Sequence, residues 1–258
     1  MFRGLYTAWT GMANEQKRLD VISNNMANSN TVGYKDEKVA SQAFDQVLGI
    51  KIRDGSQAYH NECIGSLSLG VKIGETYTDY SQGSVRQTGG TYDLALSGSG
   101  FFAVSVTDKA GEVHTRYTRD GRFHLTKDGL LVDADGNAVQ GQNGNITIDP
   151  SSKNVSISAT GQITADVELV DTLNIVDFED YDYLKKYGDT MYEPVDGATT
   201  KDAEGEILQG YTEQSNVNVV REMVDMITIT RAYEAGQKVI RSYDSMLDKS
   251  VNQVGALK

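Results

Sequence analysis

The sequence has almost no cysteine and very little proline. Its 258 residues include a single cysteine, Cys63, and two prolines, Pro150 and Pro194. One cysteine cannot form a disulfide within the chain, and by itself it does not indicate an oxidising or a reducing compartment. So few prolines exclude a proline-rich linker, whereas the 26 glycines favour tight turns and hairpins.

Long apolar runs and an excess of positive charge are also missing. No apolar stretch approaches the length of a membrane-spanning helix. The N-terminus carries Arg3 and only a short semi-apolar stretch, which is not typical of a cleaved signal peptide. The chain has 24 Lys and Arg against 36 Asp and Glu, a net charge of −12 that would repel phosphate backbones. We therefore expect no membrane insertion and no nucleic-acid partner.

The sequence offers no convincing site for catalysis, a cofactor or a metal. Its three histidines have no metal-ligand spacing with one another or with Cys63. The run Gly98–Ala103 matches G-x-G-x-x-A, but a strand-like stretch follows it where a dinucleotide site needs a helix. Asp133–Asn137 resembles a calcium loop only faintly, and a hairpin turn fits it better. We expect a non-enzyme with no cofactor, no metal and no small-molecule substrate.

The first residues have the periodicity of an amphipathic helix, from about Phe2 to Asn28. Apolar residues recur every seventh position, with two others between them: Leu5, Met12, Leu19 and Met26, then Trp9 and Ile22. A run of residues that tolerate left-handed backbone marks the end of this helix: Asn24, Asn25, Asn28, Asn30 and Gly33.

The last residues, from about Asn218 to the end, predict a second and longer helix. An unbroken seven-residue series runs through Val219, Met226, Tyr233, Ile240, Leu247 and Val254. The alternate three-four spacing falls on Met223, Thr230, Gln237, Asp244 and Val251. Asn218 is placed to cap the helix, and Glu222 lies in the first turn, where the helix dipole favours an acid.

Between the helices the pattern changes to that of short antiparallel strands. Turn-forming pairs recur every seven or eight residues, at Asp120-Gly121, Asp128-Gly129, Asp135-Gly136 and Asn143-Gly144. Further strands are predicted at 155–157, near Ile163 and at 167–177, while 181–187 is either a turn or a short helix. Residues 37–65 are polar and weakly patterned.

The fold class predicted is α+β, with terminal helices that pack in coiled-coil fashion around an inserted, mainly antiparallel β-domain. We expect a helical assembly domain of residues 1–35 and 216–258, a mobile or extended connector of residues 36–70, and a central β-domain of residues 71–215. Two helices cannot cover stripes of this extent between them, so neighbouring subunits in an open helical array are the natural partners. The alternative is a secreted binding or adhesion module whose end helices pair within one monomer.

The chain resembles the flagellar rod and hook family of axial proteins at both ends and in the middle. The N-terminal blocks are Leu5–Ala8, Ile22–Asn28 and Asn30–Lys35, including Gly33 and Tyr34. The C-terminal blocks are Gln209–Tyr211, Ser215–Asn218 with Asn216 and Asn218, Glu222–Ile227, Arg231–Ala235 and Asn252–Gly255. The middle blocks are Ser81–Ser84, Asp93–Leu96, Gly98–Phe102 and Tyr117–Gly121. Val32 and Val219 stand where family members often have proline.

The resemblance implies a basal-body rod protein, proximal or distal, rather than the longer hook protein. Such subunits pass through the flagellar type III export apparatus without a cleaved signal peptide. They polymerise through their terminal helices, with copies of themselves and other rod or hook subunits, into a hollow axial tube of the basal body. The tube transmits torque to the hook and passes exported subunits. The stripe residues are then the expected assembly interface.

Overall fold

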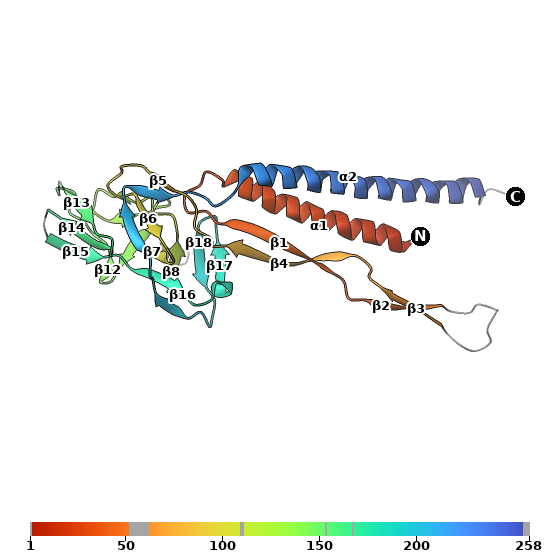
Figure 1. Ribbon diagram of the computed structural model, residues 1–258, viewed down its shortest axis with the longest axis horizontal. Coiled ribbons are helices and arrows are strands. Elements are labelled where there is room, and N and C mark those ends of the chain that lie inside the picture. Colours follow the sequence, from red (N-terminus) through yellow and green to blue (C-terminus); the bar gives the residue numbers. More distant parts are fainter. Residues whose placement is uncertain (1, 52–61, 109–110, 153, 167, 255–258) are drawn as a thin grey trace. The chain divides into compact units, whose positions relative to one another are not determined.

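The computed structural model describes residues 2–51, 62–108, 111–152, 154–166 and 168–254 (Figure 1). The chain divides into two compact units. Unit 1 contains the residues up to Met26, Glu37–Thr78 and the residues from Val219 onward, and unit 2 contains Ala27–Asp36 and Asp79–Asn218. Both chain ends therefore lie in unit 1, although they are far apart in sequence.

Unit 1 consists of two long helices and a narrow β-ribbon. Its elements are α1 (Phe2–Ala27), β1 (Asp36–Ala43), β2 (Val47–Lys51), β3 (Glu62–Leu67), β4 (Val71–Asp79), α2 (Val219–Lys249) and a π-helical turn (Ser250–Val254). The two predicted terminal helices are confirmed, and α2 has 31 residues with Glu222 in its first turn. Neither helix is both long enough and apolar enough to cross a membrane, in the part of the chain that the structure describes.

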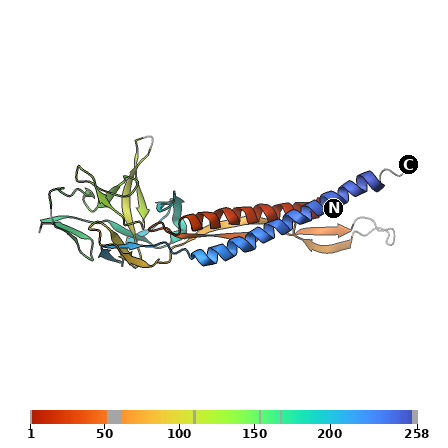
Figure 2. The same ribbon diagram turned by 90° about the horizontal axis from the view of Figure 1, so that it is seen from above.

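The helices α1 and α2 lie side by side and run antiparallel (Figures 1 and 2). A Cβ added to Gly236 of α2 would lie 2.7 Å from Met12 Cγ of α1, and one added to Gly4 would lie 2.8 Å from Tyr243 Cζ. Residue numbers thus rise along α1 as they fall along α2, and each glycine leaves room for a large side chain of the partner helix. Coiled-coil geometry for this pair remains a prediction.

The face of α2 that packs on α1 differs by one residue from the alternate spacing read from the sequence. Ile229 is buried, and Gly236 and Tyr243 contact α1, so the contact face follows these residues. Met223 and Val251 of the predicted series are 49% and 68% exposed. The alternate series was predicted as part of an assembly interface with other subunits, and that use of Met223 and Val251 stays a prediction.

Most of the other stripe residues are partly covered within the chain. Half-buried side chains are those of Leu5, Met12, Leu19, Ile22, Met26, Val219, Met226, Tyr233, Ile240 and Leu247. Trp9, in contrast, is 57% exposed. Val254 belongs to the π-helical turn, but its side chain lies outside the described part. Exposed and half-covered apolar residues on both helices leave surface for a further partner.

The ribbon of unit 1 pairs β1 with β4 and β2 with β3. Helix α1 is tied to it by side-chain hydrogen bonds: Asn14 Nδ2 donates to Ser41 Oγ (3.0 Å) and Thr7 Oγ1 to the Leu69 carbonyl (3.2 Å). The weakly patterned segment 37–65 therefore forms strands where it is described, while residues 52–61 lie outside the described part. Most of β1 and β4 is exposed or half-exposed, so no apolar alternation marks them in the sequence.

Unit 2 is built from short strands. They are β5 (Val85–Gln87), β6 (Leu94–Ser97), β7 (Phe101–Thr107), β8 (Val113–Thr118), β9 (His124–Leu125), β10 (Leu131–Val132), β11 (Ala138–Gly141), β12 (Gly144–Asn145), β13 (Val155–Ile157), β14 (Gln162–Ala165), β15 (Glu168–Thr172), β16 (Ile175–Phe178), β17 (Leu184–Tyr187), β18 (Met191–Pro194), β19 (Thr200–Asp202), β20 (Glu206–Gln209) and β21 (Tyr211–Glu213). The main sheet runs β17-β18-β8-β7-β11-β10-β9, and β16 also pairs with β7. The α+β class and the antiparallel β-region are confirmed.

The core of unit 2 lies on both faces of β7. Phe102 and Val104 belong to an apolar cluster with Leu131 and Ile163, whereas Phe101 packs with Phe178 in a second, aromatic cluster. Successive side chains of a strand point to opposite faces, so a continuous apolar run such as that of β7 fits a strand covered on both sides.

The turns predicted at Asp128-Gly129, Asp135-Gly136 and Asn143-Gly144 occur, and in each of them only the glycine is left-handed. Gly129, Gly136 and Gly144 have positive φ, at 82°, 88° and 123°. Among the described residues, Asp166 alone has positive φ without being glycine, so the Asp or Asn before each glycine is not left-handed. The asparagines that follow α1, Asn28 and Asn30, likewise do not have positive φ. Asp120-Gly121 is a corner rather than a hairpin, because β8 ends at Thr118 and Gly121 packs on the Leu94 carbonyl.

The remaining predictions for the middle of the chain are largely confirmed. The strand at 155–157 is β13, Ile163 lies in β14, and 167–177 divides into β15 and β16, with residue 167 outside the described part. Residues 181–187 are a 3₁₀ turn (Tyr181–Tyr183) followed by β17. Gly98–Gly100 is a turn that leads into strand β7, which excludes the helix that a dinucleotide site would need.

Candidate functional site

Within unit 2, the segment that follows α1 meets the segment that precedes α2. Val32, Gly33, Tyr34, Lys35 and Asp36 are all buried. The Gly33 backbone N–H donates to the Glu213 carbonyl at 2.9 Å. Gly33 has φ +71°, and a Cβ there would run into the backbone of Arg119 and Asp120. Glycine at this position is required both by the left-handed backbone and by the close approach of another chain segment.

A buried carboxylate, that of Glu213, is the centre of this meeting point. Its Oε1 accepts hydrogen bonds from Lys35 Nζ at 2.6 Å and from the Gly83 N–H at 2.9 Å. Its Oε2 accepts from Arg119 Nη1 at 3.2 Å. The side chains of Lys35 and Glu213 are each 1% exposed, and that of Arg119 is 4% exposed. We call Lys35, Glu213 and Arg119 the buried ion triad.

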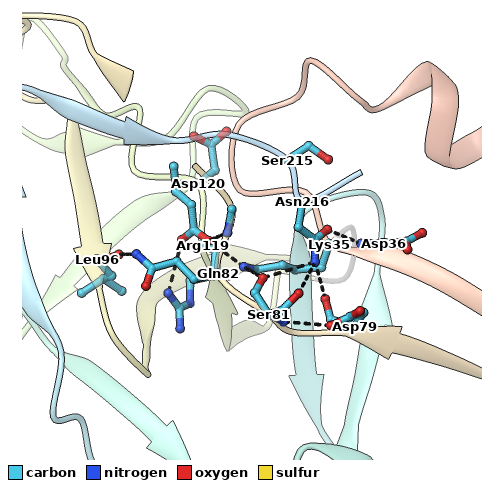
Figure 3. Close-up of polar contacts among 12 residues, drawn as sticks. Lys35, Asp36, Asp79, Ser81, Gln82, Leu96, Arg119, Asp120, Ser215 and Asn216 are labelled. Carbon is cyan, nitrogen blue, oxygen red and sulfur yellow. Dashed lines mark hydrogen bonds and ion pairs between the residues drawn. The ribbon is translucent and has the colours of Figure 1, made fainter. Parts of the chain in front are cut away.

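Both cations of the triad also donate to backbone carbonyls. Lys35 Nζ donates to the Ser81 carbonyl at 2.8 Å, and Arg119 Nη2 to the Gly98 carbonyl at 2.9 Å (Figure 3). These bonds extend the network to the loops before β5 and before β7. Since buried charges are stable only when they are paired and hydrogen-bonded, the triad fixes the relative positions of five chain segments, those at residues 35, 81–83, 98, 119 and 213.

Asn216 makes a second link beside the triad. Its Oδ1 accepts from the Asp36 N–H at 2.8 Å, and its Nδ2 donates to the Asp79 carbonyl at 2.8 Å and to Ser81 Oγ at 3.1 Å (Figure 3). A single amide therefore holds the start of β1, the end of β4 and the residues just before α2.

Burial controls the electrostatics of the triad. Burial lowers the pKa of Lys35, the Glu213 carboxylate opposes that shift, and the nearby Arg119 guanidinium adds to it. Two cations share one carboxylate, so loss of the Glu213 charge would remove the anion to which both are bonded. All three charged groups are used in internal bonds, and the arrangement fits a structural joint better than a reactive site.

Tyr34 completes the N-terminal part of this site. It is fully buried, and Lys186 Nζ lies 4.1 Å from the centroid of its ring. A cation over the face of an aromatic ring is attracted by the ring's electrons. The predicted family residue Tyr34 thus anchors the buried turn to strand β17.

The structure separates the remaining predicted asparagines into two kinds. Asn25 is 1% exposed, and its amide exchanges two hydrogen bonds with the Glu37 backbone, at 2.8 and 3.1 Å. The Asn28 carbonyl closes the next turn by accepting from the Thr31 N–H at 3.1 Å. Asn24, Asn30 and Asn218 are exposed.

The triad was not predicted. Lys35 and Glu213 are 178 residues apart, and charge alone does not indicate which lysine pairs with which acid. The available signal was the set of family blocks: Asn30–Lys35 contains Lys35, Tyr117–Gly121 contains Arg119, and Glu213 lies between Gln209–Tyr211 and Ser215–Asn218. These blocks did not indicate which side chains meet.

A second candidate surface is the exposed apolar face at the start of α2. Val220, Met223, Val224 and Ile227 are 72%, 49%, 57% and 54% exposed. They form a continuous apolar strip because residues three and four apart share one side of a helix. Only Glu222 and Ile229 are buried in the whole of α2. Such a helix has little tertiary packing to hold it, so this face fits contact with another subunit.

No group suited to metal binding accompanies these surfaces. Across the described ranges, no three or more His, Cys, Asp or Glu side chains gather where they could hold a metal ion. The Asp133 loop instead satisfies its own backbone: Asp133 Oδ1 accepts from the N–H groups of Asp135 and Asn137 at 2.9 and 2.8 Å.

Comparison with known proteins identifies the family. Residues 5–35 match the model for flagella basal body rod protein, residues 95–165 that for the flagellar hook protein FlgE/F/G D1 domain, and residues 208–254 that for the flagellar basal body rod FlgEFG protein C-terminal region. Each matched segment contributes one member of the buried ion triad.

Full-length relatives agree with these matches. The chain is 34% identical to the flagellar basal-body rod protein FlgG of Bacillus subtilis (strain 168), over 98% of this chain and 99% of the relative. It is 34% identical to FlgG of Agrobacterium fabrum, over 95% and 96%. It is 32% identical to the rod protein FlgF of Caulobacter vibrioides, over the full length of both. The chain belongs to the flagellar basal-body rod protein family.

Proposed function

We propose that this chain is a structural subunit of the bacterial flagellar basal-body rod and that it polymerises through its terminal helices. The observation that carries the proposal is the exposure of α2, a 31-residue helix in which only two residues are buried. Helices of this kind obtain their stability from packing, and here the packing must come from neighbouring subunits. The neighbours of this subunit are copies of itself and other rod and hook subunits.

In the assembled rod, the helices form a hollow axial tube and the β-domain lies outside it. The buried ion triad and Asn216 hold together the two points of unit 2 from which the helices leave. A joint closed by buried charges resists deformation, which suits a rod that transmits torque to the hook. The tube also passes exported subunits, and this chain itself uses the flagellar type III export apparatus. Its role is structural rather than catalytic.

The exposed strip of α2 gives a direct test. Val224→Asp and Ile227→Asp each place a carboxylate in the strip without touching the contact with α1. We expect the isolated chain to fold with a free energy of unfolding within about 0.5 kcal/mol of wild type, as for most surface changes. Incorporation into the rod should be lost, because an unpaired charge would be buried in the interface.

Val113→Asp is the matched control, since Val113 is 64% exposed but lies on β8 of unit 2. Motility and the protein content of isolated basal bodies are the measurements. Normal incorporation of both helix variants would show that this strip is not an assembly surface. Met226→Asp and Ile240→Asp should also block incorporation. These positions are half-buried within the chain, so a defect there distinguishes less well between lost assembly and lost folding.

A further inference from the structure

Two exposed aromatic residues of α1 form a preset contact surface. Tyr6 and Trp9 are 47% and 57% exposed, and their ring centroids lie 6.0 Å apart with the planes tilted by 38°. The two residues are three apart on a helix, so their side chains are neighbours. We call this pair the aromatic knob. Aromatic side chains bury a large apolar area when they leave water, and they dominate the energetics of protein interfaces.

An apolar groove opens elsewhere on the same helix pair. It is lined by Glu15, Gln16 and Leu19 of α1 and by Ile229, Thr230 and Tyr233 of α2. Its volume is about 260 Å³, several times the share of one water molecule in the liquid. We call it the helix groove. It is large enough to accept an aromatic side chain.

The knob cannot fill the groove of its own chain. Trp9 lies about 12 Å along the α1 axis from the midpoint between Glu15 and Leu19, at 1.5 Å per residue. Knob and groove are therefore two different patches, and their contact requires a second copy. A contact between different patches is heterologous, and repeated from copy to copy it builds an open array rather than a closed dimer.

Charge supports this pairing. Arg3 is exposed one turn before Tyr6, and it has no ion-pair partner within the described residues. The lining of the groove includes one acidic residue, Glu15, which is bonded to Arg18 at 3.0 Å, and no basic residue. A knob with an exposed cation beside it is thus complementary in charge to a groove whose only charged lining residue is a carboxylate.

We propose that the aromatic knob of one subunit inserts into the helix groove of the next copy, with Trp9 as the main anchor. This inference rests on the proposed rod function and identifies the surfaces that two copies use.

The single tryptophan makes the contact measurable. Trp9 is the only tryptophan of the chain, so the intrinsic tryptophan fluorescence reports on the knob alone. Assembly should shift the emission to shorter wavelength and protect Trp9 from a dissolved quencher. Trp9→Ala should raise the concentration needed for assembly at least roughly tenfold, as expected for a buried aromatic anchor. Tyr183→Ala is the control, because Tyr183 is 44% exposed but lies in unit 2.

Disulfide cross-linking tests the pairing itself. Two full-length chains carry Cys63→Ser, one with Trp9→Cys and the other with Gln16→Cys. Mixed, assembled and mildly oxidised, they should form a disulfide between unlike chains, whereas either chain alone should form none. A disulfide between two Trp9→Cys chains would show an isologous contact and overturn the proposal.

The failures of the two proposals are distinguishable. If the chains assemble but no mixed disulfide forms and Trp9 stays open to the quencher, the knob and groove do not meet, while the rod function stands. If the Cys63→Ser parent and the wild-type chain never assemble, the rod function fails and this contact fails with it.

Discussion

Replacing Glu213 by glutamine should be among the most damaging conservative changes in unit 2. Glutamine keeps the shape of the side chain but has one acceptor oxygen and an NH₂ group in place of two acceptors. If the oxygen faces Lys35, the NH₂ faces the Arg119 guanidinium; in the reverse orientation, it faces the donors of Lys35 and Gly83. Either orientation sets a donor against a donor and removes the carboxylate to which both buried cations are bonded.

The expected cost follows from that geometry. Breaking a buried ion pair by removing one partner costs about 3–5 kcal/mol, a large share of the roughly 5–15 kcal/mol that holds a domain folded. With a urea dependence of about 2 kcal/mol per molar, the unfolding midpoint should fall by roughly 2 M. Urea unfolding followed by far-ultraviolet circular dichroism measures the shift.

Glu206→Gln is the control for this prediction, because Glu206 is exposed on the preceding strand, β20. It should change the free energy of unfolding by no more than about 0.5 kcal/mol. Adding Lys35→Met to Glu213→Gln should cost less than Lys35→Met in the wild type, because it removes a cation that has lost its partner. Equal and small effects of Glu213→Gln and Glu206→Gln would refute the reasoning.

Two further predictions concern the helix pair and the aromatic cluster. Gly11→Ala should stabilise unit 1 by about 1 kcal/mol, because a Cβ there meets nothing and alanine favours helix. Gly236→Ala should give no such gain, because its Cβ would displace the Met12 side chain. Unfolding followed by Trp9 fluorescence measures both changes, and equal gains would contradict the antiparallel contact. Burial, and then the hydrogen bond that Tyr181 Oη donates to Asp177 at 2.8 Å, raise the pKa of Tyr181 to about 12. This raised pKa contributes stability that is complete below pH 10.0 and is lost as the pH rises through about 12. Asp177→Asn should therefore lower the pKa of Tyr181, as measured by NMR of its ring, and an unchanged pKa would show that the carboxylate has no influence.

The parts of the fold that the sequence predicts are those that a local pattern encodes. The seven-residue spacing of Leu5, Met12 and Leu19 is visible because one side of α1 is covered and the other is not. The strand at 155–157 is likewise encoded locally, by the alternation of Val155 and Ile157 about Ser156. The contact of α2 with α1 at Gly236 has no such signal, because the glycine makes this contact by being small.

The candidate site depends on contacts that no local pattern records. The β1–β4 ribbon has no buried face along most of its length, so its strands lack the alternation that marks a half-buried strand. The buried ion triad joins residues 35, 119 and 213, and only the folded chain brings them together. The resemblance to rod proteins located blocks that contain Lys35 and Arg119 and that flank Glu213, but it gave no information on which side chains meet.

Amide hydrogen exchange, compared between the dilute chain and the assembled rod, tests the central claim most directly. The account predicts that α2 amides of the dilute chain exchange through low-energy local opening, while those of β7 exchange only through the much rarer unfolding of the core. In the rod, the α2 amides should become protected, because neighbouring subunits cover the exposed strip. Protection of α2 equal to that of β7 in the dilute monomer would mean that the helix already has all the packing it needs, and it would contradict assembly through the terminal helices.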